Sequence, residues 1–169
     1  MSNAIKTEPV RLAWTNNLRN PDEKFKHSSG SPLYSASMIL TPSSLQDLKD
    51  KVTQQVGEQY TKAMFIKKLD ENRYQVKVKC VAWFENAQGR TYQTPYIFDM
   101  NGNKTDGPLE GELAIVEIVP KAYQMYRKLG MILKGVQLVE KQPKTKEEVE
   151  KEIWGTGSED QKDSQNGGS

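Results

Sequence analysis

The chain alternates apolar and polar side chains most clearly between residues 73 and 84. The face opposite the apolar one carries Gln75, Lys77, Lys79, Val81 and Trp83. A period of two residues predicts a β-strand with one buried face. Apolar segments of similar length predict further strands at 10–14, 33–40, 90–100, 113–119 and 131–141. Pro95 places part of the 90–100 strand at a sheet edge or a bend.

A helical period begins after residue 40. Thr41 is a good N-cap, and Pro42 suits the first helical position, where its missing N–H costs nothing. Apolar side chains then recur at spacings of three and four residues: Leu45, Leu48, Val52 and Val56. This pattern predicts an amphipathic helix over about 42–56. Gly57 ends or weakens the helix, and the apolar residues beyond it allow an extension to residue 64.

Charge divides the chain into a basic body and an acidic tail. The 169 residues hold 24 Lys and Arg against 22 Asp and Glu, a net charge of +2. Residues 1–143 hold 20 basic and 15 acidic residues, net +5, whereas residues 144–169 hold 4 and 7, net −3. Residues 158–169 have no hydrophobic side chain whose burial could offset the entropy of ordering them. We therefore expect a flexible N-terminus at 1–9, one domain at 10–143 and a polar, flexible, acidic tail at 144–169.

Residue counts and missing motifs exclude several classes of protein. Cys80 and His27 are the single residues of their types, which rules out an intramolecular disulfide and a Cys/His zinc site. The chain has no signature motif of nucleotide hydrolysis or of the common hydrolases. We expect no catalysis, no cofactor and no bound metal. No apolar run approaches the roughly 20 residues of a membrane span, so we expect a cytoplasmic protein without membrane contacts.

The strongest chemical pattern is a set of basic and aromatic side chains on the 73–84 strand and on the strand that returns from it. Its members are Lys77, Lys79, Trp83, Tyr92 and Tyr96 or Phe98. Tyr96 and Phe98 share one side of their strand, so either both face the groove, which we favour, or both are buried. Unpaired bases stack on aromatic rings, while Lys and Arg neutralise phosphates. Such a surface is typical of single-stranded nucleic-acid binding. The alternative is a solvated strand whose Trp83 packs beneath a loop.

Basic and aromatic residues also gather in connections between the predicted strands. The segment 120–130 contains Lys121, Tyr123, Tyr126, Arg127 and Lys128. It either borders a nucleic-acid channel or plugs the end of a barrel. The segment 19–32 contains Arg19, Lys24, Phe25, Lys26 and His27. It is either a third basic patch or an ordinary flexible connection.

Four acidic residues in turn-rich sequence are candidates for a metal site. They are Asp99, Asp106, Glu110 and Glu112. Carboxylates so placed can bind a divalent ion, but scattered acids in turns are usually turn formers. We therefore keep a small metal-dependent nuclease as an alternative and favour the structural role.

Several segments together resemble the bacteriophage single-stranded DNA-binding proteins of the OB-fold class, including a phage family otherwise described only as a domain of unknown function. The matching segments are VRLAWTNNLRNP, SPLYSASMILTPSSLQDLK, IFDMNG and GMILKGVQLVEK, within about residues 9–141. The resemblance implies a mainly β, five-stranded Greek-key barrel with one main helix and an acidic C-terminal tail used in protein contacts. The end of this chain, QKDSQNGGS, departs from the dense acidic run typical of such proteins.

The function that the residues and the resemblance together imply is non-catalytic binding of single-stranded DNA with little sequence preference. It would protect and organise DNA during phage replication, recombination or repair, in the host cytoplasm, with the tail contacting replication or recombination proteins. The expected contacts are Lys77, Lys79, Trp83, Tyr96, Phe98, Lys121, Tyr123, Arg127 and Lys128. Further candidates are Trp14, Arg19, Lys24, Phe25, Lys26 and Tyr92. The alternative from another class is a β-barrel adaptor for protein contacts during virion assembly; the oligomeric state stays open.

Overall fold

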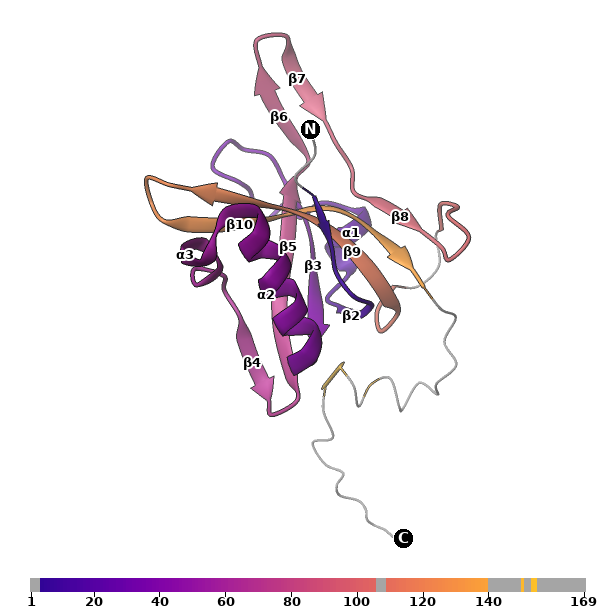
Figure 1. The fold of residues 1–169 in the computed structure, drawn as a ribbon. Helices are drawn as coiled ribbons and strands as arrows, with labels where there is room; N and C mark the ends of the chain where they lie inside the picture. Colours follow the sequence, from indigo (N-terminus) through magenta and orange to yellow (C-terminus); the bar gives the residue numbers. More distant parts are fainter. Residues whose placement is uncertain (1–3, 106–108, 140–149, 151–152, 155–169) are drawn as a thin grey trace, which may run out of the picture.

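Among the described residues, five strands close into a barrel at the centre of the molecule (Figure 1). The computed structural model describes residues 4–105, 109–139, 150 and 153–154. In barrel order the strands are β9 (Leu113–Tyr123), β2 (Val10–Ala13), β3 (Leu33–Leu40), β5 (Arg73–Val81) and β10 (Lys128–Leu138). β10 pairs with β9 and so closes the ring.

Neighbouring barrel strands run antiparallel, except β5 and β10, which run parallel. This order, a three-stranded meander whose last strand pairs in parallel with the final strand, is that of the OB-fold barrel. The predicted mainly β OB-fold is therefore confirmed. The predicted alternation along β5 is also confirmed, because Val76, Val78 and Cys80 are buried while Lys77 and Lys79 are exposed.

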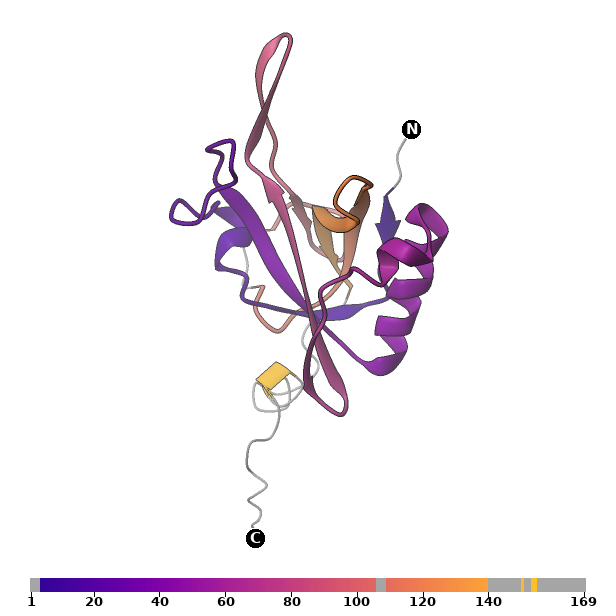
Figure 2. The same ribbon diagram turned by 90° about the vertical axis from the view of Figure 1, so that its left-hand side faces the viewer.

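The main helix, α2 (Pro42–Val56), has the bounds that the sequence predicts. Thr41 and Ser44 form a capping box, in which the Ser44 N–H donates to Oγ1 of Thr41 and the Thr41 N–H donates to Oγ of Ser44. Gly57, with φ of 102°, ends the helix, and a short helix α3 (Glu58–Thr61) follows it. α2 lies against β9, β3 and β5 and covers one side of the barrel (Figure 2).

The N-terminal residues differ from the flexible segment that we expected. β1 (Ile5–Lys6) pairs antiparallel with β9, and Ile5 is buried. The Thr7 N–H donates to the carbonyl of Val116, and its hydroxyl accepts from the Val116 N–H. Burial of one isoleucine and these backbone bonds hold the segment on the barrel.

The predicted 90–100 strand is divided at Pro95. Its first part is β7 (Gly89–Tyr92), which pairs with β6 (Trp83–Asn86) to form a hairpin that projects from the barrel (Figure 1). We call this hairpin the arm. The second part of the predicted strand is β8 (Tyr96–Phe98), which lies outside the arm and pairs in parallel with β10 at the sheet edge. Proline lacks the N–H that a continuous central strand needs, so the bend is confirmed.

Other elements were not predicted. Helix α1 (Asn16–Arg19) lies in the β2–β3 connection, and β4 (Lys67–Asp70) pairs with β5. The segment 120–130 was expected as a connection but is mostly strand, because β9 continues to Tyr123 and β10 begins at Lys128. Pro120 is tolerated in β9 because it lies beyond the residues that pair with β1, where it needs no N–H for that neighbour.

Most of the predicted tail, residues 144–169, lies outside the described residues. The described exceptions are Glu150, Ile153 and Trp154. Ile153 is buried in a small apolar cluster with Ala13 and Ile39, against which Leu69 packs. Nη1 of Arg73 donates a hydrogen bond to the carbonyl of Ile153. This part of the predicted tail therefore packs on the barrel.

Candidate nucleic-acid interface

The β2–β3 loop, the arm and the β9–β10 hairpin lie around the same end of the barrel (Figure 2). Between them is a cleft with a volume of about 800 Å³. Its lining includes His27, Lys79, Trp83, Phe84, Glu85, Lys121, Tyr123, Lys128, Gly130 and Ile132. We call this the basic cleft, because three lysines line it against a single carboxylate among these residues. Lys79, Trp83, Lys121, Tyr123 and Lys128 were predicted from sequence, and the fold brings them together.

The β9–β10 hairpin supplies one wall of the basic cleft. Tyr123 pairs with Lys128, and Lys121 pairs with Gly130, so these four residues share one face of the two-stranded ladder. The Lys121 ammonium lies 5.3 Å from the centre of the Tyr123 ring. A Cβ at Gly130 would lie 3.1 Å from Cε2 of Tyr123, so the glycine makes room for this ring. The hairpin therefore presents an aromatic plane bordered by lysines.

β5 supplies the floor of the basic cleft. Lys79 pairs with Ile132 of β10 at the parallel junction, and Lys77 is exposed two residues earlier on the same face. On the neighbouring strand β3, Lys77 pairs with Ser37 and Lys79 pairs with Ser35. Small partners keep both lysines clear of bulky neighbours. The basic row thus continues along β5 from the cleft, as the alternating sequence predicts.

A buried serine positions the base of the arm. Ser31 is fully buried, and its Oγ accepts from the N–H groups of Ala82 and Trp83 while donating to the carbonyl of Pro32. From the other strand of the arm, Gln93 donates its backbone N–H to Ala82 and its side-chain amide to the carbonyl of Val81. These bonds fix where Trp83 leaves the barrel. Sequence reasoning missed Ser31, because a serine among Ser and Gly residues has the signature of a linker.

Trp83 is half-buried, packs against the barrel core and carries a cation on its face. The Arg90 guanidinium lies 3.6 Å from the centre of the Trp83 ring. Arg90 also pairs with Glu85 at 3.4 Å. The sequence contained a weak signal for Arg90, since the turn around Gly89 predicts a hairpin that brings it opposite the residues after Trp83.

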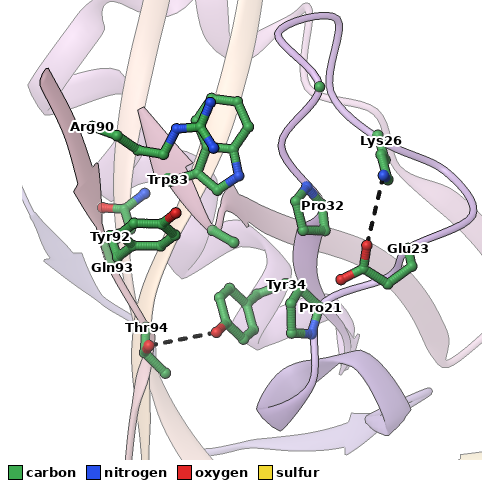
Figure 3. Close-up of a pocket in the computed structure, with 12 residues that line it drawn as sticks. Pro21, Glu23, Lys26, Pro32, Tyr34, Trp83, Arg90, Tyr92, Gln93 and Thr94 are labelled. Atoms are coloured by element: carbon green, nitrogen blue, oxygen red, sulfur yellow. Dashed lines mark hydrogen bonds and ion pairs between the residues drawn. The ribbon is translucent and has the colours of Figure 1, made fainter. Parts of the chain in front are cut away.

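A separate pocket of about 480 Å³ lies at the base of the arm (Figure 3). Its lining includes Pro21, Lys26, Pro32, Tyr34, Trp83, Arg90, Tyr92, Gln93 and Thr94. We call this the arm pocket. Trp83 and Gln93 line both the arm pocket and the basic cleft. Two of the further candidates from sequence, Lys26 and Tyr92, lie here rather than in the basic cleft.

Tyr96 and Phe98 lie on β8, outside the linings of the basic cleft and the arm pocket. Their rings stack with centres 4.8 Å apart, and the Tyr96 hydroxyl donates to Oε1 of Glu117 at 2.6 Å. Burial, followed by this carboxylate, raises the pKa of Tyr96 above its ordinary value. A Cβ at Gly135 would collide with the Tyr96 ring. The structure thus shows a covering role for Tyr96 over β10.

The remaining predicted residues are spread over other surfaces. Arg127, with φ of 51°, borders a hollow with Gln59, Tyr60, Lys62 and Gln124 on the side of α3. Arg19 donates to the carbonyl of Thr105 at 2.6 Å. Trp14 contacts Trp154. Lys24 and Phe25 are exposed in the β2–β3 loop, outside both linings.

Two of the four acidic candidates, Glu110 and Asp99, accept hydrogen bonds from backbone N–H groups. Glu110 accepts from the N–H groups of Trp14 and Thr15, and Asp99 accepts from those of Asn101 and Asn103. Asp106 lies outside the described residues. Within the described parts of the chain, no group of three or more His, Cys, Asp or Glu side chains could hold a metal ion.

The single cysteine and histidine show no sign of an activated site. Cys80 is buried on the inner face of β5, and burial raises the pKa of its thiol to about 11. Nδ1 of His27 lies 2.9 Å from Oγ of Ser29 in the exposed loop. None of the helices in the described ranges is long and apolar enough to cross a membrane.

The closed barrel with a helix between its second and third strands is an OB-fold, and similar folds occur in solved structures of phage single-stranded DNA-binding proteins. One similar structure is gp2.5, a single-stranded DNA-binding protein encoded by bacteriophage T7, at 16% identity and a TM-score of 0.62, covering 81% of this chain and 91% of that one. Another is the single-stranded DNA-binding protein of bacteriophage Enc34 in complex with single-stranded DNA, at 16% identity and a TM-score of 0.58, covering 85% and 89%.

A truncated form of the Enc34 protein, lacking its C-terminus, is similar to the same extent, with a TM-score of 0.57 and 16% identity over 85% of this chain and 88% of that one. No protein-family model matches the sequence. No curated protein matches it either. The similarity therefore lies in the fold rather than in the residues, and it confirms the fold that the sequence resemblance implied.

Proposed function

We propose that the chain binds single-stranded DNA in the basic cleft, without catalysis and with little sequence preference. The observation that carries the proposal is that Lys79, Lys121 and Lys128 line one cleft together with the Tyr123 ring, at one end of an OB-fold barrel. Three ammonium groups can neutralise consecutive phosphates, and an exposed aromatic face can stack on any base. Neither phosphate neutralisation nor ring stacking depends on which base is present, so little sequence preference follows.

Lys77 extends the proposed phosphate path along β5, because it lies on the same face as Lys79. Arg127 lies on the far side of the β9–β10 turn, so it would meet DNA that continues past the hairpin toward α3. A similar fold solved with single-stranded DNA, the Enc34 protein, supports the proposal. We further propose that binding protects and organises DNA during phage replication, recombination or repair in the host cytoplasm.

Fluorescence titration of the full chain tests the proposal. Oligo-dT and a matched duplex are titrated at two salt concentrations while tryptophan emission is followed. Oligo-dT is expected to bind more tightly than the duplex, since stacking requires unpaired bases. Log K is expected to fall with log salt with a slope of about −0.7 per phosphate contact. A double variant, Lys79→Ala with Lys121→Ala, is expected to lose affinity and slope together.

The reverse results would refute the proposal. Equal affinity for duplex and oligo-dT would mean that the chain recognises only the sugar-phosphate backbone of DNA. Absence of DNA binding, together with salt-insensitive capture of a protein partner, would instead support the adaptor function in virion assembly. A magnesium-dependent loss of the oligonucleotide during titration would support the nuclease.

We also propose that the acidic residues beyond Trp154 contact replication or recombination proteins. Ile153 and Trp154 pack on the barrel, and residues 155–169 carry three acidic residues and one basic residue. A chain ended after Trp154 is then expected to bind DNA at least as tightly as the full chain and to lose the protein partner in a pull-down. Retention of the partner would refute this role.

A further inference from the structure

Arg90 and Trp83 form a stacked pair on the arm, outside the row of lysines. The guanidinium carbon lies over the Trp83 ring, 3.6 Å from its centre (Figure 3). The Trp83 ring packs against the barrel core, and its backbone N–H is held by buried Ser31. Arg90 therefore rests on a fixed support. Its side chain keeps 42% of its surface exposed and lines the arm pocket, so part of it is accessible to a ligand.

An arginine held in this way is prepared to bind a nucleobase. The guanidinium is planar and weakly hydrated, and it stacks on aromatic planes as well as pairing with phosphates. Support by Trp83 and the ion pair with Glu85 remove much of the rotamer freedom that binding would otherwise cost. An indole, a guanidinium and a base can then form a three-layer stack.

The arm pocket supplies the surroundings for such a base. Its volume of about 480 Å³ lies within the usual range for small-molecule sites. Tyr34 and Tyr92 present rings to it, and Pro21 and Pro32 form apolar walls (Figure 3). The Tyr34 and Thr94 hydroxyls, 3.4 Å apart, and the Gln93 amide provide polar groups. Lys26 pairs with Glu23, which also lines the pocket, at 3.7 Å, whereas Arg90 pairs with Glu85, outside the lining, at 3.4 Å.

The arm pocket adjoins the basic cleft, since Trp83 and Gln93 line both. We infer that a DNA strand leaving the basic cleft passes the base of the arm and places one nucleobase in the arm pocket, stacked on Arg90. This inference rests on the proposed function and adds a second site to it. Arg90 becomes a contact that the sequence pattern did not include, and Trp83 becomes its support rather than the stacking surface itself.

The experiment compares Arg90→Lys with Arg90→Ala in the full chain, using oligo-dT of about 15 nucleotides, near the upper site size of one OB-fold. Arg90→Lys keeps the charge and the pairing with Glu85 but loses the planar group. It is expected to weaken binding about fivefold or more while leaving the salt slope unchanged. Arg90→Ala is expected to weaken binding further and to lower the slope. Lys104→Ala removes an exposed charge outside both linings and serves as the control.

A second measurement does not depend on affinity. Oligonucleotides carrying 5-iodouracil are cross-linked to the unmodified chain by light, and the adducts are mapped by mass spectrometry. Adducts on Tyr34 or Tyr92 are expected in addition to adducts on Tyr123. Adducts confined to Tyr123, or an Arg90→Lys variant that binds like the original chain, would overturn the inference.

The outcomes separate this inference from the proposed function. If Lys79→Ala with Lys121→Ala weakens binding and the Arg90 variants do not, the basic cleft stands and the arm pocket fails. If the unmodified chain does not bind oligo-dT, both fail. The melting temperatures of the Arg90 variants are compared with that of the Lys104→Ala control. Equal values exclude unfolding as the cause of any loss of DNA affinity.

Discussion

The indole rings of Trp14 and Trp154 meet edge to face, with centres 4.9 Å apart and planes at 87°. The contact joins the end of β2 to a residue 140 positions later in the chain, beside the buried side chain of Ile153. Trp14 was a candidate for base stacking. Its contact with Trp154 instead makes it part of the surface on which Ile153 and Trp154 pack, which we call the dock. We predict that Trp14 contributes to stability rather than to DNA affinity.

Truncations at two positions test this dock. A chain ended after Trp154 keeps Ile153 and Trp154, and its melting temperature is expected to match that of the full chain. A chain ended after Pro143 loses both, exposes Ala13 and Ile39, and is expected to melt at a lower temperature. Loss of one buried isoleucine costs about 1.5–3 kcal/mol in the free energy of unfolding. Equal melting temperatures for the two truncated chains would contradict the dock.

The same truncations report on charge. Removal of residues 144–169 takes away a net charge of −3 from a chain whose remainder is +5. Oligo-dT binding is expected to tighten, most strongly at low salt, because Coulomb attraction between tail and cleft is screened over about 10 Å at 0.1 M. Weaker binding at every salt concentration would show that the segment supports the barrel and does not compete with DNA.

The lysines of β5 are expected to act through phosphates. Replacing Lys77 and Lys79 with alanine should flatten the dependence of log K on log salt by about 0.7 for each lost contact. The folded state should be little affected, since both side chains are exposed. The matched control replaces Lys67 and Lys68, exposed on neighbouring β4 and outside the cleft lining. An equal loss of slope in the control would mean that net charge, and not position, determines binding.

Gly135 is expected to tolerate no side chain. Gly135→Ala would drive a methyl group into the Tyr96 ring and separate its hydroxyl from Glu117. We expect the free energy of unfolding to fall by about 1–3 kcal/mol, as measured in denaturant. In a Tyr96→Ala background the same change should cost much less. DNA affinity per folded molecule should be unchanged, whereas reduced affinity at full stability would return Tyr96 to the DNA-binding surface.

The Cys80 thiol should report on unfolding at alkaline pH. Burial raises its pKa from 9.0 to about 11, so the folded chain holds the proton more tightly than the unfolded chain. Its contribution to stability is therefore fully present below about pH 9 and is lost as the pH rises toward 11. A thiol reagent at pH 8 should react with Cys80 in denaturant and hardly at all in the native state. Rapid native labelling would contradict the burial, and Cys80→Ala should remove this part of the pH dependence.

The sequence alone determined the features that depend on local geometry. Alternation along 73–84 assigned Val76 to the core and Lys77 and Lys79 to the outside, because successive side chains of a strand point to opposite faces. Thr41 and Gly57 determined both ends of α2, because a cap and a positive φ act within a few residues. The OB-fold was implied by the resemblance of several segments to phage single-stranded DNA-binding proteins.

The tertiary structure alone decided which parts of the outer surface remain free. A period of two separates inside from outside, but the outer face of β10 is covered at Gly135 by Tyr96, and that of β3 is covered at Ile39 by Ile153. Ser31 reaches the base of the arm 52 residues away, and Arg90 reaches Trp83 only once the hairpin register is set. These contacts join residues that no local pattern connects. Which strand or loop crosses a given outer position depends on how the whole chain packs.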